Sequence, residues 1–262
     1  MIYKIKKYPV LFFTILAYIC SWIFWIGLIV TEPSGLSETV LMILGGTGPF
    51  FSAMIMTGLL RGKKGIIPWL KKIFRVRVRG RWYLLALVIP ITIAFLTIGI
   101  IVLIGGFSID ISSVAPLWAY PIFFLYIFFL GGGQEEPGWR GFALPRLLKR
   151  YSPLVSSLII GVIWAFWHVP LFFMEGSVQK DIPFVWYVLN TFGFTFIFTS
   201  LYLKAASVLP AMVLHSGLNA IGNYVPIEEG IAAAFPYLAM SSLIVALVMI
   251  LSVIGFDEFV YG

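Results

Sequence analysis

Charged side chains are scarce in this chain. Of its 262 residues, 11% are Asp, Glu, Lys or Arg and 61% are hydrophobic, whereas about a quarter of an average soluble domain is charged. So few charges cannot cover a soluble surface, which excludes a soluble globular protein. The composition therefore predicts an integral, multi-pass membrane protein. It also predicts an all-α fold, because a helix satisfies its own backbone hydrogen bonds in lipid.

Cysteine is nearly absent as well. Cys20 is the only one, so an intrachain disulfide is excluded and the redox compartment stays open. The sequence also lacks internal repeats, low-complexity tracts and any polar stretch long enough for a soluble domain. We therefore expect residues 1–262 to form a single transmembrane domain.

The hydrophobic residues are gathered into apolar segments long enough to cross about 30 Å of hydrocarbon. Each segment is bounded by charges, Gly or Pro, and their number predicts about eight transmembrane helices. The seventh is the shortest and carries His215, Ser216, Asn219 and Asn223. The segments cover residues 9–30, 39–60, 82–104, 114–132, 154–173, 184–203, 207–224 and 231–256.

The net charge of +7 does not indicate a nucleic-acid partner, because every cation except Lys180 lies in one set of loops. They lie before the first segment, between residues 61 and 81, between residues 140 and 150, and at Lys204, whereas the other loops carry mainly carboxylates. By the positive-inside rule both termini are then cytoplasmic, and an even number of spans gives the same orientation. The expected partner of the chain is the lipid bilayer.

Ionisable side chains inside apolar segments are costly, at about 2.5–3.5 kcal/mol for a charge at mid-bilayer on insertion scales. Such groups therefore face the bundle interior and have partners. Here they are few. The stretch GQEEPGWRGFALP places Glu135, Glu136 and Arg140 at the end of the fourth segment, His168 lies in the fifth, and His215 and Asn219 lie in the seventh.

The spacing of the three charges near residue 136 predicts their geometry. Glu136 and Arg140 are four residues apart, so in a helix the carboxylate can pair with the guanidinium. Glu135 is rotated by about 100° from its neighbour and faces elsewhere. Pro137 is the main threat to this geometry, because proline can break a helix. Counted from the cytoplasmic ends, His168 lies deeper than Glu135, so the fifth segment must begin outside the hydrocarbon, or tilt, for the two to meet.

Each of these features alone is more typical of packing than of function. Together, a spare carboxylate, two imidazoles and an amide are what water activation needs: a general base and donors for a developing oxyanion. Two histidines and one glutamate also match the ligand set of catalytic zinc sites, here Glu135, His168 and His215, although the compact H-E-x-x-H arrangement is missing. The residues leave the zinc and metal-free interpretations open, and zinc is the only cofactor they suggest.

Three ordered motifs carry a resemblance. EEPGWR with GFALPRL, then Trp164-x-x-x-His168, then His215-x-x-x-Asn219, resemble the CAAX-protease and bacteriocin-processing family of intramembrane proteases. That family includes the Ras-converting type II CAAX prenyl endopeptidases and the abortive-infection proteins. The resemblance covers about residues 115–224. Trp164 stands where many members have phenylalanine.

The resemblance implies an active site inside the helix bundle. Glu135 would be the base that activates water, and His168 would help to hold that water. His215 and Asn219 would stabilise the oxyanion, and the pair at positions 136 and 140 would support the site. Family members are commonly labelled metalloproteases, but a purely glutamate-dependent mechanism has also been argued, and we favour it. Water and substrate would enter from the cytoplasmic side, on which the fourth segment ends.

The expected activity is hydrolysis of a peptide bond in a membrane-associated peptide or lipidated protein. By resemblance, this is C-terminal processing of a prenylated Cys-a-a-X protein. Where protein prenylation is absent, the alternative is processing of a bacteriocin or another peptide toxin, or self-immunity towards it.

Two alternatives come from other functional classes. A proton-coupled transporter would use the same Glu and His residues as a proton relay. A non-catalytic scaffold would keep the motifs without turnover. We find no inverted repeat that supports a transporter.

Overall fold

The structure is a computed structural model that describes residues 2–105, 110–226 and 230–261. All regular elements in these ranges are helices, and no strand occurs among them. Several of the helices are long and apolar enough to cross a membrane. The prediction of an all-α, polytopic membrane protein is therefore confirmed.

The number of spans differs from the expected eight. By length and composition, six helical segments of the described chain can cross a membrane, and a seventh arises if a pair of helices bent by 44° counts as one span. The bent pair is α3 (Leu36–Gly46) and α4 (Gly48–Arg61). The six are α2 (Pro9–Thr31), Gly80–Ile104 with α6 (Gly80–Ile100), Leu117–Leu147, Pro153–Phe173, α11 (Phe184–Ala205) and Ile231–Ile254, most of which belongs to α13 (Gly230–Met249).

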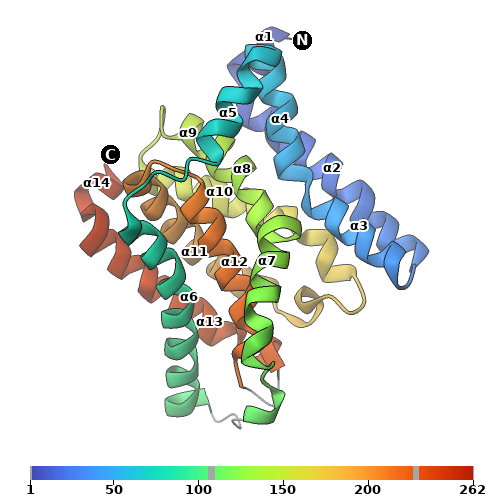
Figure 1. Cartoon of the computed structure of the whole chain (residues 1–262), viewed down its shortest axis with the longest axis vertical. Helices are drawn as coiled ribbons and strands as arrows, with labels where there is room; N and C mark the ends of the chain where they lie inside the picture. Colours follow the sequence, from blue (N-terminus) through green and yellow to red (C-terminus); the bar gives the residue numbers. More distant parts are fainter. Residues whose placement is uncertain (1, 106–109, 227–229, 262) are drawn as a thin grey trace.

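The segment predicted as the seventh span is a short internal helix. It forms α12, which covers only Leu209–Ile221, 13 residues, or about 20 Å at 1.5 Å per residue. Figure 1 shows α12 in the middle of the bundle, where it packs against α6, α11 and α7 (Tyr120–Leu130). Its polar residues His215 and Ser216 are thus buried inside the protein, whereas Asn219 is exposed.

The fourth predicted span does not end at Gly132. The chain stays helical through a 3-10 turn (Gly132–Glu135), α8 (Glu136–Gly138), a π-helical turn (Trp139–Ala143) and α9 (Leu144–Leu147). Pro137 lies in the first turn of α8. Backbone N–H groups in a first turn have no acceptor within the helix, so the N–H that proline lacks is not needed there. Pro137 therefore does not break the segment. Glu135 and its charged neighbours therefore lie within a 31-residue candidate span, Leu117–Leu147, rather than at its end.

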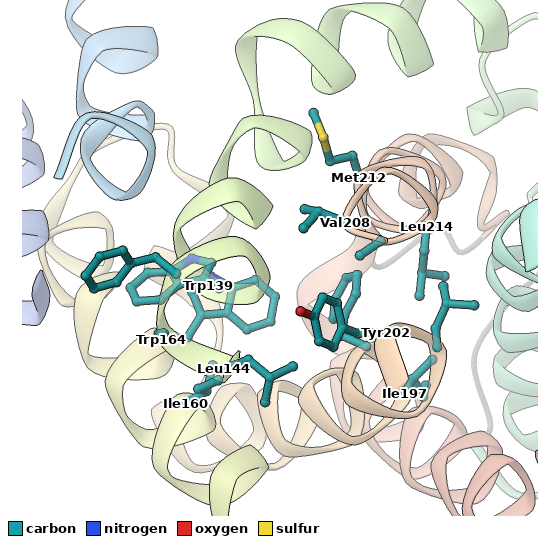
Figure 2. Packing of buried hydrophobic residues seen from close by; sticks show 14 of the residues in the cluster. Trp139, Leu144, Ile160, Trp164, Ile197, Tyr202, Val208, Met212 and Leu214 are labelled. Carbon is teal, nitrogen blue, oxygen red and sulfur yellow. The ribbon is translucent and has the colours of Figure 1, made fainter. Parts of the chain in front are cut away.

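The core around this segment is dominated by large aromatic and aliphatic side chains. Figure 2 shows Trp139 and Trp164 packed near Leu144 and Ile160, with Ile197 and Tyr202 of α11 and Leu214 of α12 across from them. Trp139 is fully buried and Trp164 nearly so. The acidic stretch is thus enclosed by α10 (Pro153–Trp167), α11 and α12.

Candidate active site

Four of the predicted site residues line one cavity of about 370 Å³. Glu135 comes from the 3-10 turn, His168 follows the last residue of α10, and His215 and Asn219 come from α12. Glu135, His168 and His215 are buried, with exposed fractions of 6%, 8% and 3%. Asn219 is exposed, so the cavity connects the buried groups with the outside.

Glu136 and Arg140 do not line this cavity and are fully buried. Nη1 of Arg140 donates to Oε1 of Glu136 at 3.1 Å, one helical turn away, as the spacing predicts. Nδ1 of His215 lies 2.8 Å from the same oxygen. The Arg140 guanidinium also lies 4.2 Å from the ring centroid of Phe198. Glu136 therefore links the cation to a cavity-lining histidine 79 residues away in sequence.

The pair is not fully satisfied by hydrogen bonds. Oε2 of Glu136 and Nε and Nη2 of Arg140 are buried without a hydrogen-bond partner among the described residues. Each charge is therefore stabilised mainly by the other, and the loss of one would leave the other isolated in a low-dielectric interior.

The carboxylate of Glu135 is held on one oxygen only. Nε1 of Trp164 donates to Oε2 at 2.8 Å, and Nε1 of Trp139 donates to it at 3.2 Å. Oε1 has no protein hydrogen-bond partner in the described part of the chain. The two indoles fix the carboxylate, and Oε1 is the oxygen that a water molecule in the cavity can reach.

The role of the indoles was missed in the sequence. The resemblance treated Trp164 as one aromatic ring in place of another, but phenylalanine cannot donate a hydrogen bond. The contact of Trp139 could have been anticipated, because Trp139 follows Glu135 by four residues and therefore shares its helical face.

His168 is fixed by its own helix and by α2. Its Nδ1 lies 2.8 Å from the carbonyl oxygen of Trp164. Because a carbonyl only accepts, Nδ1 carries the proton in this bond, and in the neutral ring Nε2 then carries the lone pair. The end of α10 is held by α2, since Trp22 donates to the carbonyl of Trp167 at 2.9 Å and Tyr18 donates to that of Ile163 at 2.6 Å.

Gly132 allows α12 to approach the 3-10 turn closely. A Cβ atom at Gly132 would collide with Nε2 of His215 and would lie 2.8 Å from Nδ2 of Asn219. These two nitrogen atoms therefore face the same small space beside the backbone of Gly132. No pattern in the sequence marks this glycine, because its role depends on a contact with a distant helix.

The expected difference in depth between Glu135 and His168 disappears in the structure. The expectation assumed that the fourth span ends at Gly132, whereas helical structure continues to Leu147. Glu135 thus lies near the middle of its segment and meets the end of α10, without any need for α10 to start outside the hydrocarbon.

Zinc is the cofactor that the residue types suggest. Among the described residues, no group of three or more His, Cys, Asp and Glu side chains is arranged to hold a metal ion. The open atoms of the three predicted ligands are nevertheless donor atoms: Oε1 of Glu135, and Nε2 of His168 and of His215, whose Nδ1 atoms bond the Trp164 carbonyl and Glu136. Such bonds through the other ring nitrogen are usual for zinc-binding histidines, so the zinc site stays a prediction.

Comparison with known proteins gives two matches. Residues 116–221 match the family model "Type II CAAX prenyl endopeptidase Rce1-like". A protein named CAAX prenyl protease 2, from Methanococcus maripaludis, is 36% identical over 122 residues, which are 44% of this chain and 42% of that protein. The match thus spans less than half of the relative's length. The resemblance predicted from the motifs is confirmed as a similarity: the part of the chain that holds all the predicted site residues is similar to the Rce1-like type II CAAX prenyl endopeptidases.

Proposed function

We propose that this chain is an intramembrane endopeptidase that hydrolyses a peptide bond in a membrane-associated substrate. The observation that supports it best is the Glu135 carboxylate, which is buried, fixed through Oε2 and open to the cavity through Oε1. The family match and the relative's name agree with this class of reaction. By resemblance, the substrate is a prenylated Cys-a-a-X protein, with an unprenylated peptide toxin as the alternative.

The residues suit a mechanism in which glutamate activates water. A water molecule held between Oε1 of Glu135 and Nε2 of His168 gives a proton to Glu135 as its oxygen attacks the carbonyl carbon of the peptide bond. The carbonyl oxygen becomes an oxyanion, which accepts hydrogen bonds from Nε2–H of His215 and Nδ2–H of Asn219. Glu135 then returns the proton to the leaving nitrogen as the C–N bond breaks.

Glu136 and Arg140 act through His215. For Nε2 of His215 to donate while Nδ1 bonds Glu136, the imidazole must be protonated, and the carboxylate of Glu136 stabilises that cation. With Glu135 and Glu136 ionised and Arg140 and His215 positive, the four charges cancel. The buried cluster is then neutral, which limits the cost of placing it in a membrane.

The proposal is tested with purified protein in lipid nanodiscs and two substrates, a farnesylated Cys-a-a-X peptide and an unprenylated hydrophobic peptide. We expect wild type to cut at least one, and Glu135→Gln to cut neither. Glu175→Gln is the matched control, because Glu175 is an exposed loop carboxylate. No cleavage by wild type, or equal cleavage by Glu135→Gln, would contradict the proposal.

The same assay tests the metal-free mechanism. No step of the proposed mechanism uses a metal ion, so we expect a zinc chelator to leave the rate unchanged. Loss of activity on chelation that is restored by added zinc would move Glu135, His168 and His215 to the role of ligands and refute the mechanism above.

A further inference from the structure

Basic side chains surround one cavity at the end of the bundle that holds α1 (Ile2–Lys7) (Figure 1). The cavity has a volume of about 430 Å³ and lies between the start of α2, the end of α4 and the end of α9. None of its described lining residues is acidic. Like charges gathered around one space repel one another, so this arrangement favours a bound anion. The cations that line the cavity are Lys6, Arg61, Arg146, Lys149 and Arg150.

The protein does not neutralise these cations itself. None of the ion pairs formed by the described residues involves a cation of this cavity. A second basic cavity differs in this respect, because Lys204, which lines it together with Arg75, Arg77 and Arg79, pairs with Glu258 at 2.8 Å. The first cavity is therefore the better candidate for an anion supplied from outside the protein.

Two arginines of the first cavity are restricted by contacts with the protein. Nη1 of Arg146 donates to the carbonyl oxygen of Phe142 at 2.8 Å, and the guanidinium lies 3.5 Å from the centroid of the Phe142 ring. Arg61 packs against the buried Gly65, where a Cβ atom would collide with Cβ of Arg61. A guanidinium binds phosphate through two parallel N–H bonds. Because both side chains are already restricted, they lose little freedom when they bind such a group.

The start of α2 adds backbone donors to the same cavity. Val10 and Leu11 lie in the first turn of α2 and line the cavity. Their N–H groups have no hydrogen-bond acceptor among the described residues, as is usual at the start of a helix, and the N-cap residue Tyr8 supplies no side-chain bond. A helix N-terminus carries partial positive charge and binds phosphate. The backbone therefore favours the same ligand as the arginines.

The rest of the lining indicates that the phosphate belongs to a lipid. Leu11 of α2 and Leu60 of α4 give the cavity an apolar side, at the ends of helices that run into the membrane. Tyr8 and Tyr151 also line it, and both are exposed. Tyrosine side chains collect at the level of the lipid headgroups. Cations beside apolar surface at this level fit a phosphate and the first methylene groups of its acyl chains, whereas a free phosphate ion gains nothing from the apolar side.

We propose that this cavity binds the phosphate group of an anionic phospholipid. Arg61, Arg146 and the N–H groups of Val10 and Leu11 hold the phosphate, and the three remaining cations offset the negative charge of the headgroup. The predicted orientation places the site on the cytoplasmic side, where the leaflet carries anionic lipids. The bound lipid joins the ends of α2, α4 and α9, and α9 belongs to the same candidate span as Glu135. The proposal does not depend on the proposed function.

Native mass spectrometry of the full chain tests the site. Delipidated protein in detergent is titrated with phosphatidylglycerol, which is anionic, with phosphatidylcholine, which has the same phosphate but no net charge, and with inorganic phosphate. We expect phosphatidylglycerol to bind at least about ten-fold more tightly than phosphatidylcholine, because hydrogen bonds between charged groups are the stronger ones. An equal concentration of inorganic phosphate should not displace it.

Two double variants locate the binding. Arg61→Gln/Arg146→Gln should weaken the binding of phosphatidylglycerol at least about ten-fold. Lys63→Gln/Lys64→Gln removes the same charge from the same end of the bundle but outside the cavity, and should change the Kd by less than about three-fold. The lipid should also raise the thermal unfolding temperature of wild type and of the lysine variant, but not that of the arginine variant.

Equal binding of the two lipids would overturn the proposal, and so would an equal loss of binding in the two double variants, since the site would then be the basic surface as a whole. Displacement by inorganic phosphate would make the ligand a free anion and refute the lipid. If Arg146→Gln prevents folding, Arg61→Gln alone decides, because Arg61 is exposed; unchanged binding in that variant would contradict the site.

Discussion

The indole nitrogen of Trp164 lies 2.8 Å from Oε2 of Glu135, and it is the shorter of two indole hydrogen bonds to that oxygen. The carboxylate is thereby held with its other oxygen towards the cavity. A phenylalanine at position 164 could not donate this bond. In the mechanism proposed above, the bond couples the orientation of the base to a side chain of α10.

Replacement of Trp164 by phenylalanine keeps a ring but removes the donor. A hydrogen bond to a charged group contributes about 1.5–3 kcal/mol, so we expect kcat/KM to fall about ten- to a hundred-fold if that contribution is lost in the transition state. Trp139→Phe removes the longer bond, of 3.2 Å, and should have the smaller effect. Steady-state kinetics of both variants, with thermal unfolding as a check of folding, would decide. A larger effect of Trp139→Phe at equal stability would count against this assignment.

Asn219→Ala tests the oxyanion donor. Loss of one such donor costs about a hundred- to a thousand-fold in kcat, and we expect KM to change little, because the interaction forms mainly in the transition state. Asn219 is exposed, so its removal should leave the thermal unfolding temperature unchanged. A raised KM with unaltered kcat would instead make Asn219 a substrate-binding residue.

Gly132→Ala tests the close approach of α12. The added methyl group would collide with Nε2 of His215 and crowd Nδ2 of Asn219, so both donors must move. We expect cleavage to fall by at least as much as in Asn219→Ala. Gly27→Ala is the matched control, because a Cβ at Gly27 in α2 meets nothing within 4 Å. Equal activity of the two variants would show that the donors do not need this geometry.

The pair of Glu136 and Arg140 can be separated into its structural and functional parts. Removal of one member of a buried pair costs about 3–5 kcal/mol, so Arg140→Met alone should destabilise the protein strongly. The double variant Glu136→Leu/Arg140→Met should recover most of that stability, since both members of the pair are replaced together. It should stay inactive, because His215 has lost the carboxylate at 2.8 Å. Denaturant unfolding and cleavage assays on the same samples check both statements, and an active double variant would refute the role given to Glu136.

Local spacing along the sequence was enough for some of these contacts. The pairing of Glu136 with Arg140 followed from their separation by one helical turn, and the gathering of two histidines with Glu135 followed from the cost of isolated polar groups in lipid. The bond between His215 and Glu136 could not be predicted in this way, because spacing along the sequence carries no information about which faces of distant helices meet.

The end of the fourth span was misplaced for a physical reason. Three glycines followed by Gln134 and two glutamates lower the local hydropathy. Low hydropathy indicates the end of a membrane-spanning helix when the charged side chains face lipid or water. Here Trp139, Trp164, Arg140 and His215 supply the hydrogen bonds, so the helical path continues through the charges. The local hydropathy of a segment does not indicate which hydrogen-bond partners other helices supply.

The short length of α12 has a consequence for the surrounding membrane. A helix of 13 residues spans about 20 Å, against about 30 Å of hydrocarbon. If α12 lies along the bilayer normal, the exposed amides at its end are below the level of the lipid headgroups. Water must then enter the thickness of the bilayer to solvate them. In the mechanism proposed above, hydrolysis would depend on this local, protein-lined thinning of the hydrophobic barrier.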